Sequence, residues 1–106
     1  MRIVVVCGAG ASSTFVAQRL RRACAEQGLA HTARAVPLQA VPACLDDADL
    51  LLVGPHLADR MDELNRDAAA RALPVVRLPH DIFGDLDGSR TLAIVTAATD
   101  DPADAG

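Results

Sequence analysis

Three short runs of consecutive aliphatic residues constrain the fold of this chain more than any other feature of its sequence. They lie within residues 2–6, 49–53 and 74–78, and none of them alternates between apolar and polar residues. Continuous Val, Ile and Leu is typical of strands covered on both faces, as in a parallel sheet between two layers of helices. A fourth, weaker run at 31–36 mixes small and polar residues and ends before Pro37, which is typical of an edge strand.

The segments between these runs have the periodicity of helices. After the first run, apolar residues recur at helical spacing and the intervening arginines fall on the other side. This pattern predicts a helix that starts near Ser12 or Ser13 and ends at Gly28, a residue suited to a C-terminal cap. A second stripe, within 57–68, predicts a helix that stops before Pro74. The stripes consist of Val16, Leu20, Ala23, Cys24 and Gln27, and of Leu57, Met61, Leu64 and Ala68.

Strands that alternate with helices form βαβ units, whose right-handed crossovers build a parallel sheet. Residues 37–47 predict a short helix or turn constrained by Pro42, and 91–99 predicts a closing helix because Asp-Gly-Ser before it supplies an N-cap. The whole chain has 106 residues, which suits one domain. We therefore expect a small doubly wound α/β domain of four parallel strands over residues 1–99, followed by a frayed acidic tail at 100–106.

Composition excludes several classes of function. The chain has fourteen acidic residues, ten arginines and no lysine, and its net charge is −4. We therefore expect no nucleic-acid binding. No apolar stretch approaches the roughly 20 residues of a membrane span, and no secretory signal is visible. We therefore expect a cytoplasmic protein that does not insert into the membrane. Arg19, Arg21 and Arg22 form a basic cluster, which we interpret as a solvated helix face rather than a docking patch.

The three cysteines have different predicted roles. Their odd number and their spacings suit neither a disulfide framework nor a metal site, so we expect no metal. Cys24 lies on an apolar stripe and Cys44 in a small-residue segment, which predicts packing roles for both. Cys7 instead ends the first strand and opens a glycine-rich loop.

The loop from Cys7 to Thr14 reads CGAGASST and contains no charged residue. In open α/β sheets, ligands bind beyond the carboxyl ends of the strands, where loop N–H groups and the following helix N-terminus attract anions. Such surroundings favour the thiolate of Cys7 and any phosphoryl group on its sulfur. The predicted phosphate-binding residues supply N–H groups, close backbone approach or hydroxyls, and they are Gly8, Ala9, Gly10, Ala11, Ser12, Ser13 and Thr14.

Several chemistries could use this loop. A dinucleotide site is disfavoured because Ser13 replaces the third glycine and no acidic residue ends the second strand. A small cysteine-dependent phosphatase or arsenate reductase needs Cys-x5-Arg, and Ser13 occupies the position of that arginine. A phosphoryl carrier needs only a nucleophile, a cradle and access, which this loop offers. A non-catalytic regulatory or thiol-sensing domain is a further alternative.

The loop resembles the Cys-Ser-Ala-Gly-Met-Ser-Thr-Ser loop of the lactose/cellobiose-type IIB components of the bacterial sugar phosphotransferase system (PTS). The likeness continues at 51–56, LLVGPH, where the family has a strand ending in Gly-Pro-Gln. It recurs at 82–88, IFGDLDG, which is similar to the family's Tyr-Gly-x-x-Asp-Gly.

The resemblance implies a flavodoxin-like, phosphatase-like sheet in the order 2-1-3-4, with helices on both faces and a phosphocysteine intermediate. By analogy, Cys7 takes a phosphoryl group from a histidine of a IIA component and passes it to a sugar bound by the membrane component IIC. The protein would then associate with the membrane through IIC, and it would need no cofactor.

Some positions depart from the family pattern. His56 has the clearest chemical consequence, because the order 2-1-3-4 places the loops after the first and third strands side by side. As a cation His56 would steady phosphoryl oxygens, as a base it would hasten hydrolysis, and the alternative is an ordinary surface histidine. We also expect partners to dock on exposed apolar residues at the rim, including Ala11, Phe15 and Pro55. The departures are Ala11 for methionine, His56 for glutamine, Asp59 for tyrosine and Phe83 for tyrosine.

Overall fold

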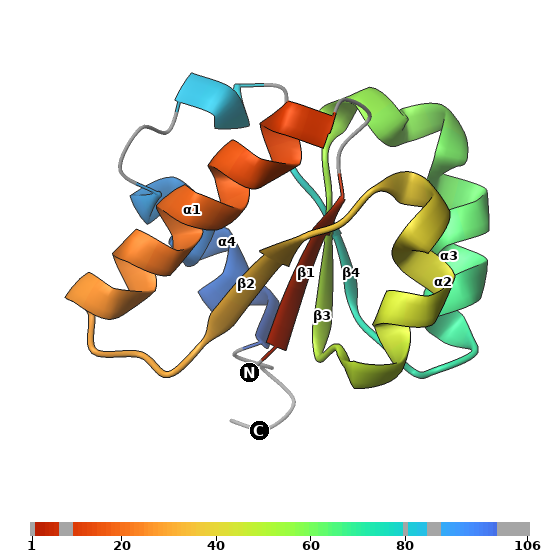
Figure 1. Cartoon of the computed structure of the whole chain (residues 1–106), viewed down its shortest axis with the longest axis horizontal. Coiled ribbons are helices and arrows are strands. Elements are labelled where there is room, and N and C mark those ends of the chain that lie inside the picture. The colour runs from red at the N-terminus through yellow and green to blue at the C-terminus, as the bar shows by residue number, and fades with distance from the viewer. Residues whose placement is uncertain (1, 7–9, 80, 85–87, 100–106) are drawn as a thin grey trace.

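Four strands and four α-helices alternate along the chain (Figure 1). The computed structural model describes residues 2–6, 10–79, 81–84 and 88–99, without the side chains of residues 10–13, 42, 56, 58, 83 and 99. The strands are β1 (Arg2–Val6), β2 (Thr32–Ala35), β3 (Leu50–Val53) and β4 (Val75–Arg77). The α-helices are α1 (Gly10–Glu26), α2 (Val41–Cys44), α3 (Met61–Ala69) and α4 (Ser89–Thr99). Short 3-10 segments are η1 (Leu38–Ala40), η2 (Leu45–Asp47), η3 (Pro55–Arg60) and η4 (Ile82–Gly84).

The sheet has the order β2-β1-β3-β4, and all three pairings are parallel. The predicted order 2-1-3-4 is therefore confirmed. β1 and β3 are the two central strands, and their last residues, Val6 and Val53, are paired. The carboxyl ends of the central strands thus meet at the same edge of the sheet.

Helices cover both faces of the sheet, as expected for a doubly wound fold. α1 and α4 lie on one side in Figure 1, and α2 and α3 lie on the other. Successive residues of a strand point to opposite faces, so each central strand contributes to two buried clusters. The cluster under α1 and α4 contains Ile3, Val5, Leu50 and Leu52, and the cluster under α2 and α3 contains Val4, Val6, Leu51 and Val53. Because both faces are buried, the two central strands need the unbroken aliphatic runs that the sequence shows.

The two outer strands differ from the central pair. β2 is an edge strand, as predicted, and the guanidinium of Arg21 donates a hydrogen bond to the Ala33 carbonyl at 2.9 Å. β4 is also an edge strand, and its residues are only partly buried or exposed. The prediction that residues 74–78 form a fully covered strand was therefore wrong, because an outermost strand has a neighbour on one side only.

Helix α1 ends as the sequence predicts but begins earlier. Gly28 has a φ of +70°, and the N–H of Leu29 donates to the Cys24 carbonyl at 2.8 Å, which together form a Schellman cap. The helix begins at Gly10 rather than at Ser12 or Ser13. The prediction placed the helix start at the hydroxyl residues, whereas the small residues before them also adopt the helical conformation.

The second predicted helix is divided. Its first turn is the 3-10 segment η3, in which Leu57 has non-helical angles (φ −106°, ψ 25°), and α3 starts only at Met61. Leu57, Leu64 and Ala68 are nevertheless buried in one cluster, as the predicted stripe requires. The kink at Leu57 keeps its side chain in the core while the backbone changes direction.

Gly88 fixes the closing helix against α1. It has a φ of +76°, it is buried, and a Cβ atom at this position would lie 2.1 Å from the Arg19 carbonyl oxygen. The Leu92 N–H donates to the Gly88 carbonyl, so Gly88 rather than Ser89 occupies the N-cap position of α4. Only glycine allows the backbones of α1 and the α4 cap to approach this closely.

We predict that Gly88→Ala lowers the free energy of unfolding by more than about 2 kcal/mol, because the new methyl group clashes with backbone atoms in addition to the cost of a positive φ. Gly28→Ala is the matched control. It has a similar φ but no atom within 4 Å of the added Cβ, so we expect a loss of about 1 kcal/mol. Urea unfolding followed by circular dichroism measures both values. Equal losses in the two variants would show that the α1–α4 contact contributes nothing.

Candidate functional site

The candidate site lies at the carboxyl edge of the sheet. β1 ends at Val6 and α1 starts at Gly10. Cys7, Gly8 and Ala9 connect them and lie outside the described residues. The ends of this connection are nevertheless set by the central strand on one side and by a 17-residue helix on the other. A short connection of this kind stands where ligands bind in open α/β sheets.

The backbone at the start of α1 is suited to anions. The first four N–H groups of a helix have no acceptor within the helix, and the helix dipole adds partial positive charge at this end. Gly10, Ala11, Ser12 and Ser13 supply these N–H groups, and the first turn contains no acidic residue. These residues therefore belong to the helix rather than to a loop before it. Thr14 follows them with an exposed side chain.

The segment after β3 lies beside the end of β1, as expected from the strand order. The Gly54 N–H donates to the Val6 carbonyl at 2.8 Å, directly before Cys7 in the chain. Gly54 and Pro55 are buried, and His56 follows as the second residue of η3. The backbone thus places residue 56 in the segment adjoining the Cys7 connection, while the His56 side chain lies outside the description.

The segment at 82–88 lies against α1 as well. η4 and α1 are in contact, and the Ile82 side chain is buried in the same cluster as Val16 and Leu20 of α1. Gly88 contacts the α1 backbone as described above. The described parts of the three stretches that the sequence singled out, at 10–14, 51–56 and 82–84, therefore lie at the first half of α1 and at the strand ends beside it (Figure 1).

The predicted apolar rim is only partly confirmed. Phe15 is 53% exposed, and the guanidinium carbon of Arg19 lies 5.8 Å from the centre of its ring. Pro55 is buried, so it was wrongly assigned to the exposed rim. The Gly54 hydrogen bond draws this segment against the end of β1 and removes Pro55 from solvent. The Ala11 side chain lies outside the description.

The two other cysteines have different surroundings. Cys24 is 2% exposed within the apolar cluster under α1, which confirms its packing role, and burial raises the pKa of its thiol. Cys44 is partly exposed, and Arg34 of β2 donates a hydrogen bond to its sulfur at 3.2 Å. Cys44 therefore is not purely a packing residue. No sequence pattern indicates this contact, because it joins an edge strand to a helix ten residues away.

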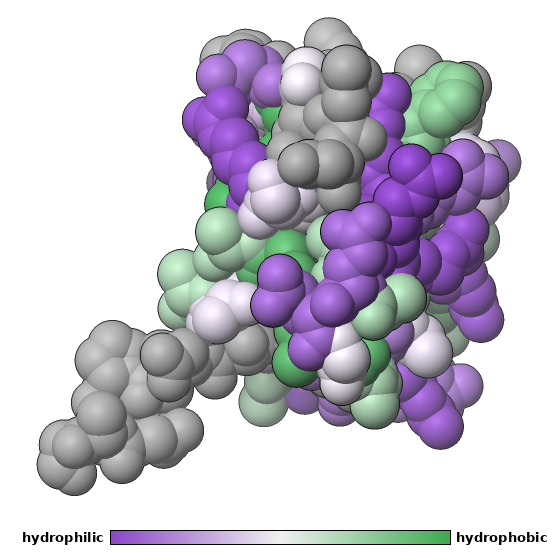
Figure 2. All heavy atoms as spheres, turned by 90° about the vertical axis from the view of Figure 1, so that its left-hand side faces the viewer, coloured by the Kyte–Doolittle hydropathy of each residue, from purple (hydrophilic) through white to green (hydrophobic). Residues whose placement is uncertain are grey.

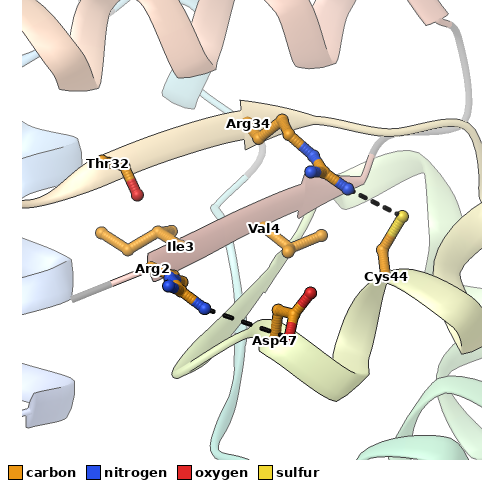
Figure 3. A pocket seen from close by; sticks show the side chains of 7 residues that line it. All are labelled: Arg2, Ile3, Val4, Thr32, Arg34, Cys44 and Asp47. Atoms are coloured by element: carbon orange, nitrogen blue, oxygen red, sulfur yellow. Dashed lines mark hydrogen bonds and ion pairs between the residues drawn. The ribbon is translucent and has the colours of Figure 1, made fainter.

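Cys44 lines a pocket of about 200 Å³ that is separate from the candidate site (Figure 3). In the close-up, Arg34 points toward Cys44 from one side, and Arg2 points toward Asp47 at a distance of 3.9 Å. Arg2 and Thr32 are the first residues of their strands, so the pocket extends toward the amino ends of β1 and β2. The Cys7 connection lies at the opposite ends of these strands.

Within the described part of the chain, no helix combines the length and apolar character that a membrane span requires. The same residues contain no group of three or more His, Cys, Asp or Glu side chains that could hold a metal ion.

Comparisons with known proteins agree with this geometry. The family model described as the lactose/cellobiose-specific IIB subunit of the PTS matches residues 2–93. The lactose-specific IIB component domain from Streptococcus pneumoniae superposes with a TM-score of 0.84 at 17% identity, covering 93% of this chain and 97% of that one. The cellobiose-specific IIB component from Borrelia burgdorferi gives 0.75 at 22% identity, covering 94% and 92%. At these identities the structural likeness shows the fold. A search of curated proteins found no match.

We predict that Cys44 reacts with a thiol reagent such as 5,5′-dithiobis(2-nitrobenzoic acid) in the folded protein and that Cys24 does not, because Cys24 is buried and its pKa is raised. The Cys7→Ser chain makes the measurement simple, because only these two thiols remain. One thiol should react in buffer and a second only in denaturant. A second fast thiol in buffer would mean that the cluster under α1 opens readily.

Proposed function

Because this chain belongs to the lactose/cellobiose-specific IIB subunits of the sugar phosphotransferase system, we propose that it carries a phosphoryl group on Cys7. The donor is a phosphohistidine of a IIA component, and the acceptor is a hydroxyl of a sugar held by the membrane component IIC. One observation carries the proposal: Cys7 directly follows a central strand and stands three positions before the first residue of a long helix. Family membership supports the role of a phosphotransferase component.

In the first transfer, the Cys7 thiolate attacks the phosphorus of the donor phosphohistidine. The S–P bond forms as the N–P bond breaks, the electron pair returns to the imidazole, and the imidazole takes up a proton. Phosphoryl transfer depends mainly on positioning and on stabilisation of charge on the equatorial oxygens. The N–H groups at the start of α1 are the donors that would meet this charge, with the hydroxyls of Ser12, Ser13 and Thr14 as further donors.

In the second transfer, the sugar hydroxyl attacks the phosphorus and the sulfur leaves as a thiolate. The hydroxyl proton passes to a base outside residues 7–14, because this stretch contains no titratable group other than Cys7 itself. We propose that the base belongs to the acceptor component. A thiolate stabilised by backbone N–H groups is a good leaving group, so the same environment assists both transfers.

The phosphatase alternative has less support. A phosphatase loop of this type holds the phosphoryl oxygens with an arginine, and that position is Ser13, in the first turn of α1. A loop without a cationic clamp or a general acid suits transfer to a docked partner better than hydrolysis.

We expect Cys7→Ser to abolish phosphoryl acceptance and Cys24→Ser and Cys44→Ser to retain it, because only Cys7 stands at the strand end before α1. Each chain is incubated with phosphoenolpyruvate, the general PTS components and a IIA component, and its intact mass is measured. The expected product carries one phosphoryl group, on the sulfur of Cys7. A label on a histidine, or Cys7-dependent hydrolysis of an aryl phosphate at enzymatic rates, would refute the carrier role.

We further propose that His56 influences the lifetime of the phosphoprotein, since its backbone lies beside the end of β1. A protonated imidazole would stabilise the phosphoryl oxygens, and a neutral one would act as a base toward water. If His56 has this role, the lifetime of the phosphoprotein should fall several-fold between pH 5 and pH 8, and His56→Gln should remove this part of the pH dependence. The measurement follows loss of the phosphoryl group by mass from pH 5 to 8. An unchanged profile in the variant would show that His56 is a surface residue without this role.

A further inference from the structure

One side of α1 carries exposed residues that the core does not use. Phe15, Gln18, Arg19 and Arg22 are spaced i, i+3, i+4 and i+7, so they lie along one side of the helix. Phe15, Gln18 and Arg22 are exposed, and Arg19 is partly exposed. We refer to these four residues as the α1 stripe. In Figure 2, which looks onto the α1 and α4 side, hydrophilic side chains gather over α1 beside more apolar surface.

The α1 stripe combines an aromatic ring with cations. Phe15 and Leu29 are the large hydrophobic residues that stand out as exposed in the described chain, and Phe15 is the one near the carboxyl edge of the sheet. The Arg19 guanidinium lies over the Phe15 ring, which holds both side chains in one arrangement. Exposed aromatic and arginine side chains are the residue types that contribute most to protein interfaces.

The longest helices on the two faces of the sheet differ in charge. α1 contains three arginines and one glutamate, whereas α3 contains one arginine and three acidic residues. An acidic group of an approaching protein is therefore attracted to α1 and repelled from α3.

We propose that the α1 stripe is the docking surface for the phosphoryl donor and that the donor meets it with an acidic patch surrounding an apolar site for Phe15. This inference rests on the proposed carrier function, because it names how the partner of that same site is recognised. It replaces the interpretation of these arginines as a merely solvated face. Phe15 is the apolar rim residue that belongs to this docking surface. From Phe15 the surface continues along α1 to Arg22.

The position of the stripe suits this role. A helix rises about 1.5 Å per residue, so Phe15 lies roughly 8 Å and Arg22 roughly 18 Å along the axis from the first helical residue. A partner domain that places a phosphohistidine at Cys7 is wide enough to cover this length. Arg19 and Arg22 belong to α1 and not to the connection that contains Cys7. They therefore attract the donor without clamping the phosphoryl group.

The test compares two double variants of the full chain with equal changes in charge. Arg19→Glu/Arg22→Glu alters the α1 stripe, and Arg2→Glu/Arg66→Glu alters exposed arginines at the amino end of β1 and on α3. Rapid-quench kinetics with phosphorylated IIA gives the second-order rate constant for Cys7 phosphorylation at low and high salt. Thermal unfolding confirms that each variant is folded.

We expect the α1 double variant to be phosphorylated at least about tenfold more slowly at low salt, with the difference shrinking as salt rises. The control double variant should stay within about threefold of the unaltered chain. Phe15→Ala should slow phosphorylation at both salt concentrations, because its contribution is apolar. Equal slowing of the two double variants, or no slowing by the α1 variant, would overturn the proposal.

A binding measurement separates this inference from the carrier function. The affinity of the Cys7→Ser chain for IIA, measured by calorimetry, should fall at least about tenfold when Arg19→Glu/Arg22→Glu is added. If this fall is seen but the unaltered chain accepts no phosphoryl group, docking stands and the carrier function fails. If the unaltered chain is phosphorylated on Cys7 but neither binding nor rate depends on the stripe, the carrier function stands and this inference fails.

Discussion

The parallel pairing of β1 with β3 is the constraint on which the rest of the structure depends. Both strands are buried on both faces, and their register aligns Val6 with Val53. The ladder continues one step further through the Gly54 N–H and the Val6 carbonyl. That bond brings a segment 47 positions further along the chain than Cys7 to the end of the first strand. The geometry of the candidate site therefore follows from strand register, not from contacts made by the loop itself.

Helix α1 contributes both to the hydrophobic core and to the candidate site. The inner side of the helix supplies Val16, Leu20 and Cys24 to the core, and its first turn supplies the N–H groups of the candidate site. The backbone at Gly88 packs closely against the Arg19 carbonyl of α1. The sheet packs along the inner side of α1, and the α4 cap packs against it at Arg19, so both contacts help to set the direction of the helix that presents these N–H groups. A fixed set of N–H groups can stabilise charge without reorganising during transfer.

Most of the fold could be predicted from the sequence because the signals are local. Aliphatic runs identify the buried strands, and Gly28 ends α1 with the cap that its position predicts. The misassigned features depend on distant contacts. The partial exposure of β4 follows from its place at the sheet edge, and the burial of Pro55 follows from a bond to β1. At the site, the sequence located the end of β1, the approximate start of α1 and the adjoining segment after β3. It could not show that the small residues from Gly10 onward are already helical.

The proposed carrier function accounts for the different charge of the loop and of the helix. If Cys7 both receives and releases a phosphoryl group, a guanidinium bonded to the phosphoryl oxygens would slow the second transfer by stabilising the intermediate. Recognition of the proposed acidic partner would still need cations. Arg19 and Arg22 belong to α1 and not to the connection that contains Cys7, so they would meet both demands, because attraction between charges acts over about a Debye length of 10 Å. A phosphatase, which need not pass its phosphoryl group to a docked partner, gains from the opposite arrangement, with the arginine inside the loop.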